Sequence, residues 1–146
     1  MKIRALDHVA LLVKDVEITR QFYGQVLGLE EILRPQSFDF SGAWFAIGTQ
    51  SLHIIGESEA GRTQQVQPGN YRPDELALGR ATHIAFEVDD LQETVAYLNA
   101  EGVPIAGGPR PRGDGVMQLY ICDPDGYVVE LFAWEKQKRP GFFEGM

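Results

Sequence analysis

The amino-acid sequence predicts an α+β domain made of two modules, each running strand, helix, strand, strand, strand (βαβββ). Three observations indicate this class: one segment occurs twice, short runs alternate between apolar and polar residues, and turn residues separate these runs. The 146 residues are 44% hydrophobic and 23% charged, as in one globular domain. We expect module 1 at about 4–56, a linker at 57–80, module 2 at about 81–134 and a tail at 135–146.

The repeat begins with a strand and a helix. LDHVALLVKDVEITRQFY, from Leu6, aligns with ATHIAFEVDDLQETVAYL, from Ala81. Both segments read as an alternating strand, an aspartate at the junction, and a helix with apolar residues at helical spacing. The identical pairs are His8 and His83, Ala10 and Ala85, Val13 and Val88, Asp15 and Asp90, and Thr19 and Thr94.

Three further strands complete each module. A glycine ends each helix, and a short strand is expected after it. Two strands joined by a turn follow, and the turn DPDG in the second module has the residues that start and close tight turns. Aligning the last strands places His53 on Glu130. The segments that carry these strands are Gly28–Ile32 and Gly42–Gly56 in module 1, and Gly102–Ala106 and Gly115–Ala133 in module 2.

Four metal-binding side chains occupy equivalent positions of the two modules. The chain has only three histidines, and with Glu130 they fall in the first and the last strand of each module. Alternation puts them opposite the more apolar strand faces, which should pack on the helices. A histidine and carboxylate set around an open position is typical of a catalytic divalent metal. The predicted ligands are His8, His53, His83 and Glu130.

Each of these residues also has an ordinary interpretation. A single histidine in a strand is most often a hydrogen-bonded side chain, and Glu130 alone would be assigned to a solvated strand face. The coincidence of four placements in two modules favours the metal site over these alternatives.

The quoted segments, together with DPDGYVVELF, resemble the vicinal oxygen chelate superfamily over nearly the whole chain. This superfamily includes glyoxalase I, fosfomycin resistance proteins, methylmalonyl-CoA epimerase, extradiol dioxygenases and bleomycin resistance proteins. The resemblance implies that the two modules form a cupped mixed sheet around one metal ion, with the helices on the outer face. It also implies a homodimer, because a second subunit often completes the cup in members of this length.

The sequence departs from several members of the superfamily. Glyoxalase I places an arginine four residues after its first ligand and an asparagine four after its second, both for glutathione, whereas this chain has Leu12 and Glu57. Fosfomycin transferases have a threonine where this chain has Ala10, but Tyr120 matches their tyrosine ten residues before the last ligand. Extradiol dioxygenases share that tyrosine and need a further histidine, which this chain lacks.

Two functions from different classes remain open. The first is a metal-dependent lyase, isomerase or dioxygenase acting on a small oxygenated, anionic substrate, with Glu130 and Tyr120 as catalytic residues. Its cofactor would be one divalent ion per site: Zn, Ni, Mn or Fe. The second is a protein that binds a drug or metabolite without reaction. In either case Arg110 and Arg112 could bind an anion, and Trp44, Phe132 and Trp134 could form apolar walls.

Charge and cysteine content limit the partners and the compartment. The net charge is −8, which disfavours nucleic acid and anionic membrane surfaces as partners. No apolar run approaches the length of a membrane span. Cys122 is the only cysteine, so no intrachain disulfide is possible and nothing indicates secretion. We therefore expect a cytoplasmic protein whose partners are a small-molecule substrate and a second copy of itself.

Overall fold

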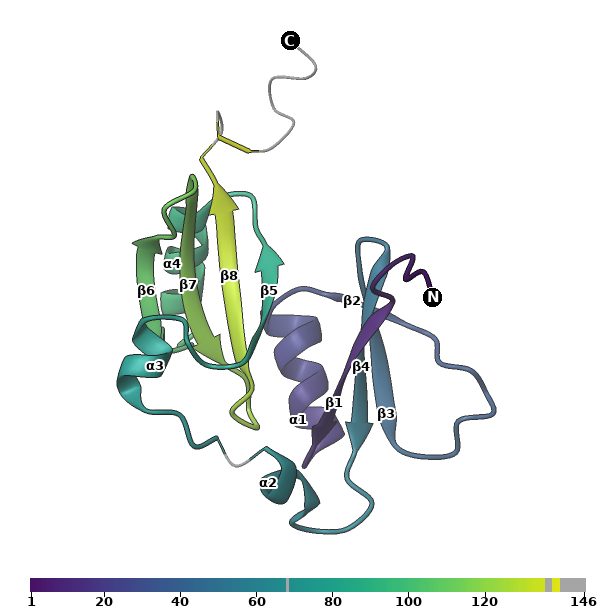
Figure 1. The fold of residues 1–146 in the computed structure, drawn as a ribbon. Helices are drawn as coiled ribbons and strands as arrows, with labels where there is room; N and C mark the ends of the chain where they lie inside the picture. Colours follow the sequence, from purple (N-terminus) through teal and green to yellow (C-terminus); the bar gives the residue numbers. More distant parts are fainter. Residues whose placement is uncertain (68, 136–137, 140–146) are drawn as a thin grey trace. The chain divides into compact units, whose positions relative to one another are not determined.

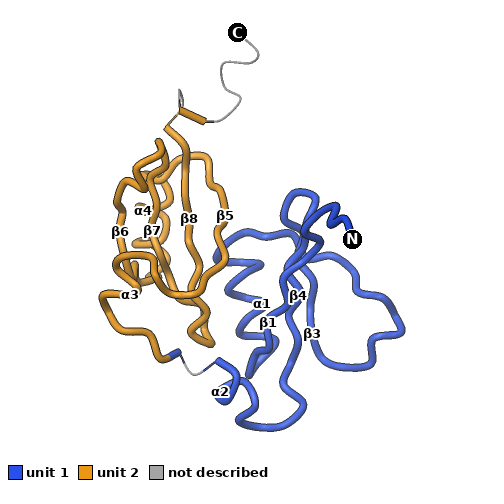
Figure 2. Tube along the Cα trace, in the orientation of Figure 1, with its two compact units in different colours: residues 1–69 blue, residues 70–146 orange. Residues whose placement is uncertain are grey.

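The computed structural model describes residues 1–67, 69–135 and 138–139. Two units follow each other along the chain, residues 1–69 and residues 70–146 (Figure 2). Most of the tail expected at 135–146 lies outside the described residues. No helix among those described is long and apolar enough to cross a bilayer.

The first unit contains a four-stranded mixed sheet with the strand order β1-β4-β3-β2. β1 runs parallel to β4, and the other neighbouring strands are antiparallel (Figure 1). The helix expected after β1 begins as an α-helix and continues as a π-helix. The elements are β1 (His8–Val13), α1 (Val16–Arg20), η1 (Gln21–Val26), β2 (Glu30–Ile32), β3 (Gly42–Ile47), β4 (Gln50–Gly56) and α2 (Arg62–Val66).

The second unit repeats this arrangement with the strand order β5-β8-β7-β6. β5 is parallel to β8, and the remaining pairs are antiparallel. The prediction of two βαβββ modules is therefore confirmed. The elements are α3 (Pro73–Ala77), β5 (His83–Glu87), α4 (Leu91–Ala100), β6 (Gly107–Pro111), β7 (Val116–Cys122) and β8 (Val128–Trp134).

One strand of the second module lies elsewhere than predicted. The prediction of a strand within Gly102–Ala106 is wrong, because β6 occupies Gly107–Pro111 instead. Its prolines lack N–H donors and its pairing with β7 shifts register between Gly107 and Arg110, features tolerated at a sheet edge. The glycines and prolines of β6 are typical of a loop, so strand propensity does not predict this strand.

The apolar strand faces pack under the helices, as alternation predicts. In unit 1, Val13, Phe45 and Leu52 have no exposed surface. A side chain on Gly24 of η1 would meet the Phe45 ring at 3.1 Å, so helix and sheet are in close contact. The corresponding face of unit 2 buries Leu119 and Val129 completely. The opposite face of each sheet carries the polar residues considered below.

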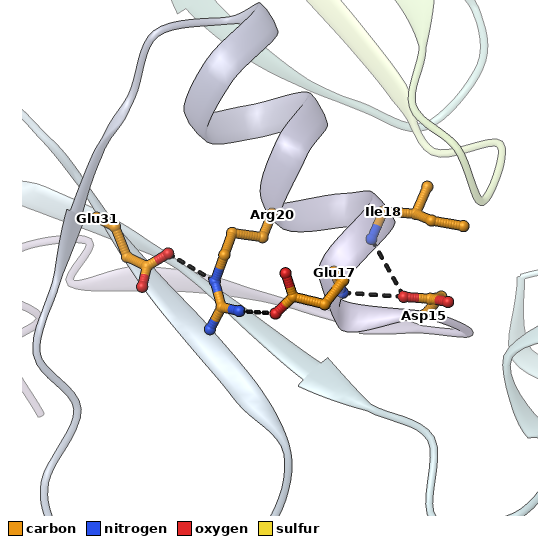
Figure 3. Close-up of polar contacts among 5 residues, drawn as sticks. All are labelled: Asp15, Glu17, Ile18, Arg20 and Glu31. Carbon is orange, nitrogen blue, oxygen red and sulfur yellow. Dashed lines mark hydrogen bonds and ion pairs between the residues drawn. The ribbon is translucent and has the colours of Figure 1, made fainter.

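The repeated aspartates begin the helix of each module. Asp15 accepts hydrogen bonds from the N–H groups of Glu17 (2.9 Å) and Ile18 (3.1 Å), which satisfies donors that have no partner within the helix (Figure 3). Arg20 then joins this helix to β2 through Glu31, with 2.7 Å between Nε and Oε1. In the second module, Asp90 caps α4 by accepting from the N–H of Glu93 at 2.9 Å. The alignment of these two aspartates thus has a structural cause.

Replacing the cap of α4 should destabilise the protein measurably. Asp90→Ala leaves N-terminal donors of the helix without their acceptor, and a loss of about 1 kcal/mol in unfolding free energy is expected. Asp89→Ala removes the same charge one residue earlier and should change it by less than about 0.5 kcal/mol. Urea unfolding of both variants measures the difference, and equal losses would contradict the capping role.

Candidate functional site

The first half of the predicted site is a stack of aromatic rings on β1, β3 and β4. Ala10 and Trp44 are both register partners of His53, so the three residues share one sheet face. His8, two residues before Ala10, shares that face. The His8 and His53 rings stack with centroids 4.1 Å apart and planes at 11°, and Trp44 stacks on His53 at 3.8 Å and 4°. The structure therefore brings the two predicted ligands of module 1 together.

Hydrogen bonds define which nitrogen of His8 is free. Its Nδ1 lies 2.7 Å from Oδ2 of Asp7, and a carboxylate can only accept, so Nδ1 carries the proton. The Nε2 lone pair is then available to a metal ion, and a carboxylate on the other nitrogen is the usual outer partner of a metal-binding histidine.

His53 has a different environment. Its Nε2 lies 2.9 Å from the hydroxyl oxygen of Ser51. Desolvation by burial lowers the pKa of His53, and the neighbouring His8 lowers it further. Both effects favour the neutral imidazole that a metal requires. His8 and His53 would hold an ion together if one of the two rings turned out of the stack.

The second half of the site contains His83, Glu130 and Tyr120. Nδ1 of His83 is 2.7 Å from the carbonyl oxygen of Ala81, so Nδ1 donates and Nε2 is free to bind a metal. Glu130 is only 4% exposed and is held by the Tyr120 hydroxyl, which donates to Oε1 at 3.1 Å. The Tyr120 ring also contacts His83 edge to face, with centroids 5.4 Å apart.

Burial distinguishes the two interpretations of Glu130 and changes the pKa of Tyr120. A solvated strand face would leave a glutamate exposed, so the ordinary interpretation of Glu130 is wrong. Desolvation raises the pKa of the Tyr120 phenol, and the charge of Glu130 raises it further. Tyr120 therefore stays protonated as a hydrogen-bond donor near neutral pH.

Predicted substrate-binding residues lie beside Glu130 on the same sheet face. Phe132 and Trp134 follow Glu130 at two-residue intervals along β8. The guanidinium of Arg112 lies 5.6 Å from the Phe132 ring centroid and 5.5 Å from that of Trp134. Hydrogen bonds to Asp114 orient Arg112 and raise its pKa. Arg110 donates instead to the carbonyl of Leu78 at 2.6 Å, and its Nε is buried without a partner.

Each unit thus assembles two of the four predicted ligands. Unit 1 contains His8 and His53, and unit 2 contains His83 and Glu130. Within the described part of either unit, no three histidine, cysteine, aspartate or glutamate side chains are grouped closely enough to hold a metal ion. The donor chemistry fits a divalent ion, because two imidazoles have a free Nε2 and the carboxylate is buried.

An aromatic cluster beside the histidines escapes sequence analysis. Phe38 contacts the edge of Trp44 at 5.6 Å and stacks on Phe40 at 5.2 Å. Arg34 lies over Phe40 at 5.1 Å and donates to its carbonyl at 2.5 Å. These residues belong to an irregular loop, where no periodicity indicates which side chains meet. The motif FDF, two phenylalanines in a polar stretch, is the only local signal.

The sequence and structure of the chain are similar to proteins of one family. The family model described as the Glyoxalase/Bleomycin resistance protein/Dioxygenase superfamily matches residues 5–131. "Glyoxylase I 4" of Arabidopsis thaliana is 27% identical over 90% of this chain and 71% of its own length. A "Probable lactoylglutathione lyase" of Synechocystis is 28% identical, covering 91% and 98%. The crystal structure of a glyoxalase/dioxygenase from Nostoc punctiforme is 29% identical with a TM-score of 0.72, covering 90% and 92%.

The environment of His53 predicts how stability depends on pH in metal-free protein. Because the folded-state pKa of His53 is lowered, the unfolded chain binds a proton there more readily below about pH 6.5. Stability should therefore fall as the pH drops through about 6.5 and level off below the folded-state pKa. In the presence of a chelator, the urea midpoint of wild type should fall more between about pH 7.5 and about pH 5.5 than that of His53→Gln. Equal falls would contradict the assignment.

Proposed function

The chain belongs to the Glyoxalase/Bleomycin resistance protein/Dioxygenase superfamily, and on that premise we propose that it is a divalent-metal-dependent enzyme of the glyoxalase or dioxygenase type. The observation that carries the proposal is the equivalent placement of a pair of donors in each module, on the sheet face opposite α1 and η1 in module 1 and opposite α4 in module 2. In module 1 the pair is His8 and His53, and in module 2 it is His83 and Glu130.

The four donors together would hold one divalent ion. Three neutral imidazoles and one carboxylate suit Zn, Ni, Mn or Fe. A bound ion would supply Lewis-acid stabilisation of negative charge developing on a substrate oxygen. With a single carboxylate among the ligands, the site keeps one formal positive charge, which favours an anionic substrate over a neutral one.

Other steps of the proposed reaction, proton transfer and substrate binding, are assigned to side chains of this protein. Glu130 is a ligand in this proposal and, as in glyoxalases, could also take a proton from the substrate at a carboxylate oxygen. Tyr120 holds Oε1 of Glu130 in place through their hydrogen bond. Arg112, which lies over the Phe132 ring, would attract the substrate anion. Trp44, with the adjoining Phe38, would contact an apolar part of the substrate.

Glutathione recognition is not part of the proposal. The superfamily resemblance places an asparagine for glutathione at the position of Glu57. Here the Glu57 carboxylate accepts hydrogen bonds from the N–H groups of Thr63 (2.8 Å) and Gly61 (3.3 Å), which orders the start of α2. That carboxylate is occupied, and its charge disfavours the carboxylates of glutathione. The relatives named lactoylglutathione lyase therefore support the class of chemistry rather than the substrate.

A second function is favoured by the aromatic cluster of module 1. Phe38 is 36% exposed and Phe40 is 42% exposed, and both adjoin Trp44. A protein that binds a drug or metabolite without reaction would use such a surface. Two results together would favour this alternative. The wild-type protein would turn over no α-dicarbonyl or catechol substrate, and Phe38→Ala would lose ligand binding while keeping its metal.

Metal content tests the proposal directly. Protein purified without an affinity tag should contain about one divalent ion per chain. His83→Ala and Glu130→Gln should each weaken nickel binding by at least about tenfold, because each removes a ligand or the charge that offsets the cation. Calorimetric titration with Ni²⁺ measures both variants.

The matched control is Glu93→Gln, the same substitution in the first turn of α4 on the opposite side of the sheet. It should leave nickel affinity unchanged. Unaltered affinity in Glu130→Gln would remove that residue from the site and the catalytic proposal with it.

The proposal includes a cytoplasmic homodimer. Each module presents only two donors, and members of this length commonly complete the cup by pairing. Light scattering at micromolar concentration should give twice the chain mass of 16.3 kDa. A protein that stays monomeric and still binds one nickel ion per chain would contradict a cup shared between two subunits.

A further inference from the structure

The segment that enters module 2 lies against the site face of its sheet. We call this segment, Tyr71–Ala81, the strap. Its Tyr71, Leu76 and Ala81 pack with Tyr120 and Val128 in a small hydrophobic cluster. Val128 and Tyr120 belong to the face of the sheet that carries Glu130, since Val128 pairs with His83 and Tyr120 pairs with Glu130. The strap therefore packs directly on the residues of the candidate site.

Two glycines allow this close approach. A side chain on Gly107 of β6 would meet the carbonyl oxygen of Leu76 at 2.5 Å and the Cα of Ala77 at 2.9 Å. A side chain on Gly79 would lie 2.1 Å from the Tyr120 hydroxyl oxygen and 2.5 Å from Cζ of the same ring. The strap backbone at Gly79 thus touches the hydroxyl group that donates to Glu130.

Arg110 fastens the strap to the edge of the sheet. It extends from β6 and donates from Nη2 to the carbonyl oxygen of Leu78 at 2.6 Å, one residue before Gly79. Its Nε is buried without a partner. The Arg110 guanidinium also acts on the Tyr120 phenol, whose pKa it lowers against the larger effects of burial and of Glu130.

The strap forms the outer layer over a buried pair. Leu78 is 42% exposed, while Tyr120 is 3% exposed and Glu130 is 4% exposed. The phenol is confined between the strap backbone on one side and the Glu130 carboxylate on the other. The side of Glu130 toward Phe132 remains more open, since the Arg112 side chain above that ring is 37% exposed.

We propose that the strap is part of the active site, with Gly79 and Arg110 as positioning residues that hold the Tyr120 hydroxyl against Glu130. In this role Arg110 contacts the strap and Tyr120 rather than the substrate. The strap closes the Tyr120 side of Glu130, so the substrate reaches the carboxylate from the side of Phe132 and Arg112. The catalytic meaning of this placement rests on the proposed function, because it requires that Glu130 is a ligand and base.

The position of Tyr120 can be observed without metal or substrate. Protein labelled with 3-fluorotyrosine gives a fluorine NMR signal for Tyr120, assigned by its loss in Tyr120→Phe. Gly79→Ala should displace that signal, because the new methyl group collides with the ring. Gly102→Ala is the matched control, since Gly102 has nearly the same φ (+71° against +69°) but nothing lies within 4 Å of an added Cβ. Equal spectra for Gly79→Ala and wild type would overturn the proposal.

A second pair of variants avoids added bulk. Arg110→Met removes both the donor to Leu78 and the charge beside Tyr120 while keeping the side-chain length, and it should displace the Tyr120 signal even if Gly79→Ala does not fold. Arg72→Met removes a charge from an exposed part of the strap, where Arg72 pairs with Glu75, and should leave the signal in place. An unmoved signal in Arg110→Met would remove the fastening role.

Nickel affinity separates positioning from general stability. Loss of an outer partner of a metal ligand typically weakens binding by about 10–100-fold, so Gly79→Ala should weaken Ni²⁺ binding by about tenfold. In a Tyr120→Phe background the same change should add little, because both substitutions act through one hydroxyl. Additive losses would contradict the proposal. If Glu130→Gln binds nickel like wild type, the proposed function fails, whereas the fluorine spectrum still decides the role of the strap.

Discussion

Side-chain alternation along paired strands is the constraint on which the rest of this structure depends. Register fixes Ala10 beside His53 in one module and Ala85 beside Glu130 in the other, so a small residue adjoins the last-strand donor in both. A slip of one residue would turn these donors toward the helices and expose Leu52 or Val129, which are fully buried. The hydrophobic energy of the helix-facing core thereby determines where the polar groups of the site point.

Much of this arrangement follows from the sequence, because it depends on periodicity. The aligned histidines, the capping aspartates and the faces of the strands all follow from a pattern of two or of three to four residues. The position of β6 does not, since this edge strand is defined by the pairing of Gly107, Arg110 and Pro111 with β7 rather than by strand propensity. The hydrogen-bond partners that fix which imidazole nitrogen carries the proton do not follow from the sequence either. The carbonyl of Ala81 and the contact of Gly79 with Tyr120 depend on where a polar, irregular segment settles, and no periodicity governs that.

The burial of Glu130 connects the fold to the chemistry. An ionised carboxylate with 4% exposure needs partners, and the unit that contains it supplies the Tyr120 hydroxyl. A cation shared with the histidines would supply the rest. The strap determines which side of this carboxylate is covered, so a segment that looks like a linker in sequence takes part in the site. Relatives 27–29% identical to this chain match about 90% of its length.

In the proposed site, three imidazoles and one carboxylate, two donors from each module, would bind a single ion. Proton NMR of the cobalt(II)-loaded protein tests it most directly, because each ligating imidazole gives one strongly shifted, exchangeable N–H signal. A histidine that binds through one ring nitrogen keeps the N–H of the other, and in His8 and His83 this N–H donates to Asp7 and Ala81. If all three histidines bind the ion, the wild-type spectrum should contain three such signals, and one should disappear in each histidine variant. Two or fewer signals in the wild-type protein would contradict the proposed site.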